Sequence, residues 1–284
     1  MGLLPKDFSL GPLLRVAVFV VFAALGLWLL PPLMLPVGGL LVTAVLATFA
    51  AAAIANALCL RIYERARLDA IGMQWNRDSV RNLLAGLAGG AVAALLVLVP
   101  PLLLGLAEMR PNPEMPLDWG TLAFVSVLLI FGAIGEEMLF RGYGFQVLIS
   151  LVGPFATILP AGFLFGVLHS GNQGGSNLSL ANTTGWGIIL GVAFLRSGDL
   201  WFPIGLHLGW NWVLPLMGVP LSGFPISLLG RSMHWQAGEI WSGGAYGPEG
   251  GVLTSIVLLL LGVYLWRAPV HGQEPFLLRP RKEG

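Results

Sequence analysis

The chain has 284 residues, of which 56% are hydrophobic and 10% are charged, and its formal net charge is +1. Its mean hydropathy of +0.81 exceeds what a soluble domain of this size can bury, so the composition excludes an ordinary soluble domain. The few basic residues form no stripe of the kind that binds nucleic acid. Cys59 is the one cysteine, which excludes an intramolecular disulfide and a cysteine-only metal site.

Long apolar segments follow one another along the chain, and a helix needs about 20 residues to span a bilayer. We expect about eight such helices, at residues 13–35, 36–60, 82–107, 119–148, 154–169, 180–196, 199–217 and 250–267. The segments after residue 150 are short and are separated by Gly-, Pro- and Ser-containing stretches that end helices. The sequence therefore predicts an all-α, polytopic membrane helix bundle that forms a single domain over residues 1–284.

Basic residues are concentrated in two places, the loop after the second segment and the C-terminal tail. They are Arg61, Arg65, Arg67, Arg77 and Arg81, followed by Arg267, Arg279, Arg281 and Lys282. The positive-inside rule places both groups in the cytoplasm, and an even number of helices returns both termini to that side. The loops at 108–118 and 218–249 should then lie on the outer side. We interpret the arginines at 61–81 as topology determinants and contacts for anionic lipids.

The stretch 135-GEEMLFRGYGF-145 places three ionisable groups at the end of an apolar run. Charged groups at membrane depth are costly unless they are paired or hydrated, which makes them functional candidates. Glu137 and Arg141 are four residues apart and are expected to form an ion pair on one helix face, which is a structural explanation for both. Glu136 points away from Glu137, onto the face shared with Gly132 and Gly135, where a helix or a water-filled cavity can approach. A carboxylate in this position is a candidate general base.

Two later segments carry the remaining polar candidates. His169 follows Phe165 by four residues, and Asn211 follows His207 by four, with Gly209 on a different helix face. A lone His or Asn in a membrane helix is usually a packing or hydrogen-bonding residue. One Glu, two His and one Asn on three neighbouring segments instead favour a polar cavity inside the bundle.

Three short motifs, in this order and at this spacing, resemble those of the CPBP intramembrane proteases. They are Glu136-Glu137-x-x-x-Arg141, Phe165-x-x-x-His169 and His207-x-x-x-Asn211. That family includes the type II CAAX prenyl endopeptidases and the Abi-like bacteriocin-immunity proteins. The resemblance covers residues 118–217, which we expect to be the CPBP/Abi-like catalytic core. It implies an all-helical fold and hydrolysis of peptide bonds in a cavity within the bilayer.

The resemblance also implies roles for single residues. Glu136 would be the general base that activates water, and His169 would help to hold that water. His207 and Asn211 would donate hydrogen bonds to the developing oxyanion. Three further residues would support the site without reacting: Glu137, Arg141 and Phe165. The expected function is an intramembrane endopeptidase acting on a membrane-associated or lipidated peptide or protein, with CAAX-type processing implied by the resemblance.

The cofactor stays open at this point. Two His and one Glu can in principle hold Zn²⁺ with a fourth position for water, and the candidate ligands are Glu136, His169 and His207. The sequence contains no HExxH motif, so the zinc arrangement built on one helix is absent. A metal-free glutamate mechanism uses the same residues, and we favour it over a metalloprotease.

Two other classes of function compete with a protease. Buried Glu and His residues also form proton relays in proton-coupled transporters, although such carriers are built from internal repeats and none is evident in this sequence. A catalytically silent membrane scaffold or immunity protein could use the same fold. The scaffold predicts that Glu136→Gln leaves the cellular phenotype intact, whereas the protease predicts loss of activity. The expected partners are the lipid bilayer and a membrane-associated substrate, with no nucleic acid.

Overall fold

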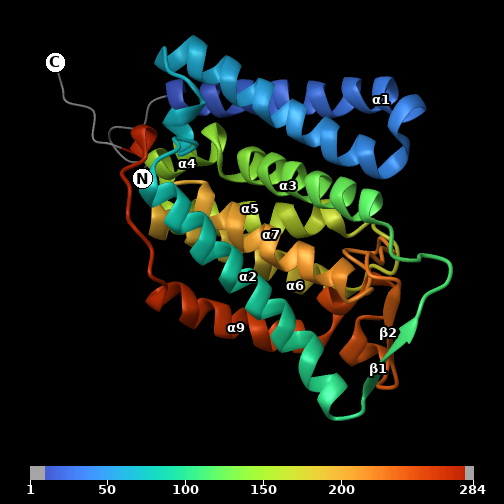
Figure 1. Cartoon of the computed structure of the whole chain (residues 1–284). Helices are drawn as coiled ribbons and strands as arrows, with labels where there is room; N and C mark the ends of the chain where they lie inside the picture. The colour runs from blue at the N-terminus through green and yellow to red at the C-terminus, as the bar shows by residue number, and fades with distance from the viewer. Residues whose placement is uncertain (1–9, 279–284) are drawn as a thin grey trace.

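The computed structural model describes residues 10–278, and helices dominate it (Figure 1). The α-helices are α1 (Leu10–Cys59), α2 (Arg77–Leu103), α3 (Trp119–Arg141), α4 (Tyr143–Val152), α5 (Pro154–His169), α6 (Asn177–Ser197), α7 (Trp201–Leu216), α8 (Glu239–Ser242) and α9 (Val252–Arg267). Short helical turns are η1 (Leu60–Glu64), η2 (Leu68–Ile71), η3 (Gly244–Tyr246), η4 (Pro248–Gly250) and η5 (Phe276–Leu278). The strands are β1 (Ala107–Pro111) and β2 (Arg231–Trp235). The prediction of an all-α bundle is confirmed.

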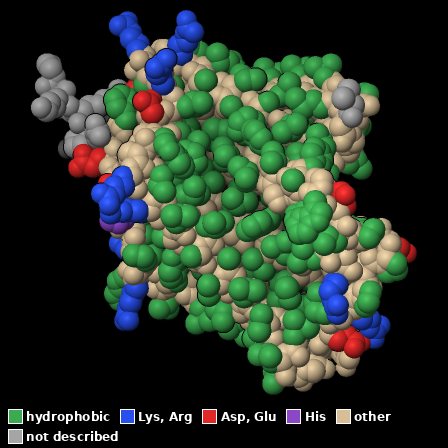
Figure 2. Space-filling view, viewed as in Figure 1, with side chains coloured by type: hydrophobic (Ala, Val, Ile, Leu, Met, Phe, Trp, Pro, Cys, Tyr) green, Lys and Arg blue, Asp and Glu red, His purple; other side chains and the backbone are tan. Residues whose placement is uncertain are grey.

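The surface of the bundle is that of an integral membrane protein. Within residues 10–278, five helices are long and apolar enough to cross a membrane: Gly11–Pro36, Gly38–Glu64, Arg77–Leu103, Trp119–Val152 and Asn177–Ser197. Two shorter apolar helices are Pro154–His169 and Val252–Arg267. Figure 2 shows charged side chains mainly at two opposite ends of the molecule, with a largely hydrophobic surface between them. The predicted number of eight transmembrane helices is not confirmed.

Helix α1 consists of two antiparallel halves (Figure 1). Gly39 lies between them with φ 67° and ψ −177°, a backbone conformation that glycine adopts far more easily than other residues. On either side of this turn, Gly26 packs directly against Ala51, since a Cβ at Gly26 would lie 2.6 Å from the Ala51 Cβ. The two halves correspond to the predicted segments 13–35 and 36–60.

The predicted segment 119–148 is divided at Gly142 into α3 and α4. The Asn56 side chain forms hydrogen bonds with the backbone groups on both sides of this break. Its Oδ1 accepts from the Tyr143 N–H at 2.7 Å, and its Nδ2 donates to the Met138 carbonyl at 2.9 Å. A Cβ at position 142 would lie 2.3 Å from Asn56 Oδ1, so only glycine fits. This long-range contact places Arg141 at the C-terminal end of α3.

Helices α2 and α7 approach closely through glycines. A Cβ at Gly90 would lie 2.0 Å from the Leu206 carbonyl oxygen, and one at Gly209 would lie 2.2 Å from that of Leu87. Small residues of this kind let helix backbones touch. Because the glycine face of α7 packs against α2, the face that carries the polar residues of α7 turns toward α3.

We expect Gly209→Ala to destabilise the bundle by about 1–3 kcal/mol, because the new methyl group must push α7 away from the Leu87 carbonyl. Thermal unfolding in detergent, followed by tryptophan fluorescence, would measure the loss. Gly262→Ala in α9 is the matched control, since a Cβ there meets no atom within 4 Å. A Gly209→Ala protein as stable as the Gly262→Ala protein would contradict the close packing.

Two loops meet at one end of the bundle. Strand β1 pairs antiparallel with β2, with Met109 opposite Met233, so the predicted loops 108–118 and 218–249 lie side by side. Neither strand was expected from the sequence. At the other end lie the start of α1, the start of α2 and η5 (Figure 1). That this second end faces the cytoplasm stays a prediction.

Candidate active site

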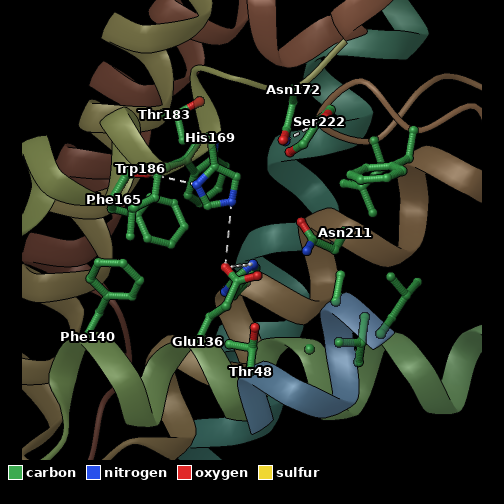
Figure 3. A pocket seen from close by; sticks show the side chains of 18 of the residues that line it. Thr48, Glu136, Phe140, Phe165, His169, Asn172, Thr183, Trp186, Asn211 and Ser222 are labelled. Carbon is green, nitrogen blue, oxygen red and sulfur yellow. Dashed lines mark hydrogen bonds and ion pairs between the residues drawn. The ribbon is translucent and has the colours of Figure 1, made fainter. Parts of the chain in front are cut away.

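A cavity of about 330 Å³ opens inside the bundle, lined by residues from five helices and from the segment before α9. Figure 3 shows Glu136 from α3, His169 from α5 and Asn211 from α7 lying around it, with Thr48 of α1 close by. His207 of α7 lines the same cavity. The structure therefore brings together all four residues that the sequence analysis named as catalytic candidates.

Glu136 faces both histidines. Its Oε2 lies 3.9 Å from His169 Nε2 and 3.8 Å from His207 Nε2. These separations are too long for direct hydrogen bonds, and they suit a bridging water. Oε2 is buried and has no hydrogen-bond partner among the described residues. The preceding residue, Gly135, packs against the backbone of Phe49 in α1, which seats this turn of α3 against the second half of α1.

His169 is held in one ring orientation. Its Nδ1 lies 2.8 Å from the carbonyl oxygen of Phe165, which can only accept, so Nδ1 carries the proton. In the neutral ring Nε2 is then an acceptor, and it is the nitrogen that faces Glu136. The Phe165 ring lies 4.5 Å from the imidazole, centroid to centroid, and supports it from the side.

Glu137 connects α3 to α7. Its Oε1 accepts from Arg141 Nη1 at 3.2 Å and from His207 Nδ1 at 3.0 Å. The ion pair between Glu137 and Arg141 that the sequence predicted is present, and both side chains are almost fully buried, at 0% and 1% exposed. Arg141 also donates from Nη2 to the Gly187 carbonyl of α6 at 2.7 Å. This network holds the His207 ring with Nε2 toward Glu136.

Arg141 and Asn211 complete the surroundings of the site. The Arg141 guanidinium lies 5.3 Å from the centroid of the Phe165 ring, a cation–π contact that links α3 to α5. Asn211 lies one helical turn beyond His207 and lines the cavity (Figure 3). No hydrogen bond joins its side chain to another residue between 10 and 278. Its amide is therefore free to bind a molecule in the cavity.

Sequence reasoning missed a second acid at the cavity, Glu249. It belongs to the segment that we expected to be an outer loop, but the chain folds back so that this carboxylate is 7% exposed. Glu249 accepts hydrogen bonds from Trp210 Nε1 at 3.1 Å and from Ser222 Oγ at 2.9 Å, and also from the Ser222 backbone N–H. Asn172 donates to the Ser222 carbonyl at 2.9 Å. An isolated acid within 247-GPEGG-251 was the one available signal.

Burial raises the pKa of the Glu249 carboxyl above its ordinary value of 4.5, while the hydrogen bonds from Ser222 and Trp210 lower it in part. The folded protein therefore binds this proton more tightly than the unfolded chain does. As a consequence, the free energy of unfolding should fall as the pH rises from about 4.5 through the pKa of the folded state.

We expect Glu249→Gln to lack this fall in stability with pH, because glutamine does not titrate. Denaturation in detergent between pH 4.5 and 8 would measure the slope for both proteins. Glu114→Gln, a change at an exposed acid outside the cavity, is the control and should keep the wild-type slope. Equal slopes for wild type and Glu249→Gln would show that Glu249 does not contribute.

The zinc alternative that the sequence left open stays a prediction. Among the described residues, no group of three or more His, Cys, Asp or Glu side chains is placed to hold a metal ion. The candidate ligands Glu136, His169 and His207 do come together: Nδ1 of each ring is engaged in a hydrogen bond, and Nε2 of each ring faces Glu136. We assign no step of the chemistry to a metal.

Residues 118–213 match a family model described as Type II CAAX prenyl endopeptidase Rce1-like. The match spans about a third of the 284 residues and includes every residue of the three motifs. This segment is similar to the Rce1-like family. No curated protein matches the chain. The resemblance predicted from the three motifs is therefore confirmed.

The Rce1-like segment does not close the cavity alone. It begins directly before α3 and reaches into α7, so α1, α2 and α9 lie outside it. Thr48 and Val45 of α1 line the cavity, as do Ser222 and Glu249. The walls opposite the motif residues therefore come from parts of the chain that the family model does not cover.

Proposed function

We propose that this protein is an intramembrane endopeptidase that hydrolyses a peptide bond in a membrane-associated or lipidated peptide or protein, in the manner of CAAX processing. One observation carries the proposal: Glu136 Oε2 faces the Nε2 atoms of His169 and His207, within 3.9 Å of each, in a cavity inside a membrane bundle. The description of the matched family as prenyl endopeptidases supports the same activity.

In the proposed reaction, water is the nucleophile. Glu136 removes a proton from a water molecule that also donates a hydrogen bond to His169 Nε2, and the water oxygen attacks the peptide carbonyl carbon. The carbonyl oxygen becomes an oxyanion. When this intermediate collapses, the C–N bond breaks and Glu136 returns its proton to the leaving nitrogen. The products are a new carboxylate and a new amine.

In this proposal, Asn211 and His207 stabilise the oxyanion. The Asn211 amide can donate without any change of protonation. His207 already donates from Nδ1 to the Glu137 carboxylate, so its Nε2 can donate only when the ring is an imidazolium. Glu137 is the counterion of that positive ring, and Arg141 in turn balances Glu137. In a poorly hydrated cavity, donors fixed in this way contribute strongly to the rate.

The apolar walls of the cavity support a lipidated or strongly apolar substrate. Besides the polar groups, the lining includes Leu41 and Val45 of α1, Leu129 of α3 and Leu168 of α5. An aliphatic group attached near the scissile bond would lose contact with water there, which favours binding by about 0.8 kcal/mol for each buried CH₂.

The test is hydrolysis by the purified protein in lipid nanodiscs. We expect cleavage of membrane-bound peptides and the appearance of one ¹⁸O atom in the new carboxylate when the reaction runs in H₂¹⁸O. Prenylated and unprenylated forms of the same peptide, compared by mass spectrometry, would measure the preference for lipidation. Activity should persist after dialysis against a chelator. Failure to cleave any peptide of a broad membrane-anchored library would contradict the proposal.

A further inference from the structure

The second half of α1 carries an exposed face that changes from apolar to basic at the end of the membrane span. Ile54, Leu58 and Ile62 are 50%, 38% and 55% exposed and follow one another at four-residue spacing. Arg61 and Arg65 continue the same exposed face at the end of the helix. The candidate span itself is Gly38–Glu64, so this change occurs where the span ends.

Three arginines at this position line one recess of about 900 Å³. They are Arg61, Arg65 and Arg67, and Ala57, Ala66, Leu68 and Asp69 complete the lining. Asp69 is the one acid among them, so the recess carries an excess of positive charge. Figure 2 shows that Arg side chains gather at the end of the molecule where α1 ends and α2 begins.

No acidic side chain in the described part of the chain pairs with these three arginines, whereas Arg15 and Arg81 nearby are paired. Arg15 pairs with Glu64 at 2.9 Å and Arg81 with Asp78 at 3.3 Å. Within residues 10–278, neither an ion pair nor a side-chain hydrogen bond engages Arg61, Arg65 or Arg67.

The backbone adopts an uncommon conformation at Arg65, which brings the three arginines together. Arg65 has φ 52° and ψ 34°, a left-handed conformation that non-glycine residues seldom adopt. It ends the wide helical turn η1 (Leu60–Glu64) and allows the chain to turn sharply. As a result, Arg67 comes to line the same recess as Arg61 and Arg65 instead of continuing along a helix.

We propose that this recess binds the phosphate headgroup of an anionic lipid. The planar guanidinium group donates paired hydrogen bonds that match phosphate oxygens. The acyl chains of such a lipid would lie along Ile54, Leu58 and Ile62, whose exposed side chains lead from the recess into the membrane. A free phosphate shares the headgroup chemistry but gains nothing from these apolar side chains, so the geometry points to the lipid.

Native mass spectrometry of the detergent-purified protein would test the site, with phosphatidylglycerol compared with phosphatidylcholine of the same chains. The test variant is Arg61→Gln/Arg65→Gln/Arg67→Gln. The matched control, Arg77→Gln/Arg81→Gln/Arg267→Gln, removes three arginines outside the recess. At about 1 kcal/mol for each arginine near a membrane surface, the test variant should bind phosphatidylglycerol roughly 100-fold more weakly, and the control should bind like wild type.

Several results would overturn the proposal. Equal binding of the two lipids by wild type would show that no anionic headgroup is recognised. An equal loss in the control would show a general effect of charge rather than a site. Competition by millimolar inorganic phosphate as strong as that by the lipid would assign the recess to a soluble anion. If the triple variant does not fold, Arg67→Gln alone should weaken binding about fivefold, and an unchanged affinity would equally refute the site.

Discussion

Glu136→Gln should lower kcat for peptide hydrolysis by about 10²–10⁴-fold, because glutamine cannot take the proton from water. The side chain keeps its size and its place at the cavity wall, so substrate binding should change little, and KM should stay within a few-fold of the wild-type value. Steady-state cleavage of a fluorescence-quenched peptide in nanodiscs would measure both constants.

The control for this change is Glu114→Gln, which removes an exposed acid outside the cavity and should leave kcat unchanged. Size-exclusion profiles and thermal unfolding would show that the Glu136→Gln protein is folded. A folded variant with wild-type turnover would remove Glu136 from the mechanism. If the folded wild-type protein itself shows no hydrolytic activity, the result would favour the silent scaffold that the sequence left open.

Arg141→Met should destabilise the protein by about 3–5 kcal/mol, because it leaves Glu137 buried without its counterion. Glu137 is 0% exposed, so the carboxylate has no access to solvent that could compensate. The change also removes the hydrogen bond from Nη2 to the Gly187 carbonyl of α6. Thermal or denaturant-induced unfolding in detergent would measure the loss.

The double variant Glu137→Gln/Arg141→Met separates charge from packing. If the cost of Arg141→Met arises from the unpaired carboxylate, the double variant should regain much of the lost stability. Its turnover should still be low, because His207 then lacks the carboxylate that accepts from Nδ1. A double variant no more stable than Arg141→Met would show that the buried charge is not the cause.

Local patterns in the sequence predicted most of the helices. The apolar run 154–169 coincides with α5, because Gly153 and Pro154 begin it and the glycine-rich stretch after His169 ends it. The ion pair between Glu137 and Arg141 was also predictable, since residues four apart on a helix are neighbours whatever surrounds them. The division at Gly142 was not, because Asn56, on another helix, supplies the hydrogen bonds that stabilise it.

The sequence by itself therefore determined a membrane-embedded helical protein, its resemblance to one protease family through three short motifs, and the polar residues to be tested. Hydropathy and i, i+4 spacing are local properties, so no tertiary contact is needed to recognise them. Only the tertiary structure decided that Glu136 faces both histidines, that Glu137 reaches His207, and that Glu249 returns to the cavity. These contacts join residues tens of positions apart. They depend on how closely helices such as α2 and α7 can pack, which no local pattern encodes.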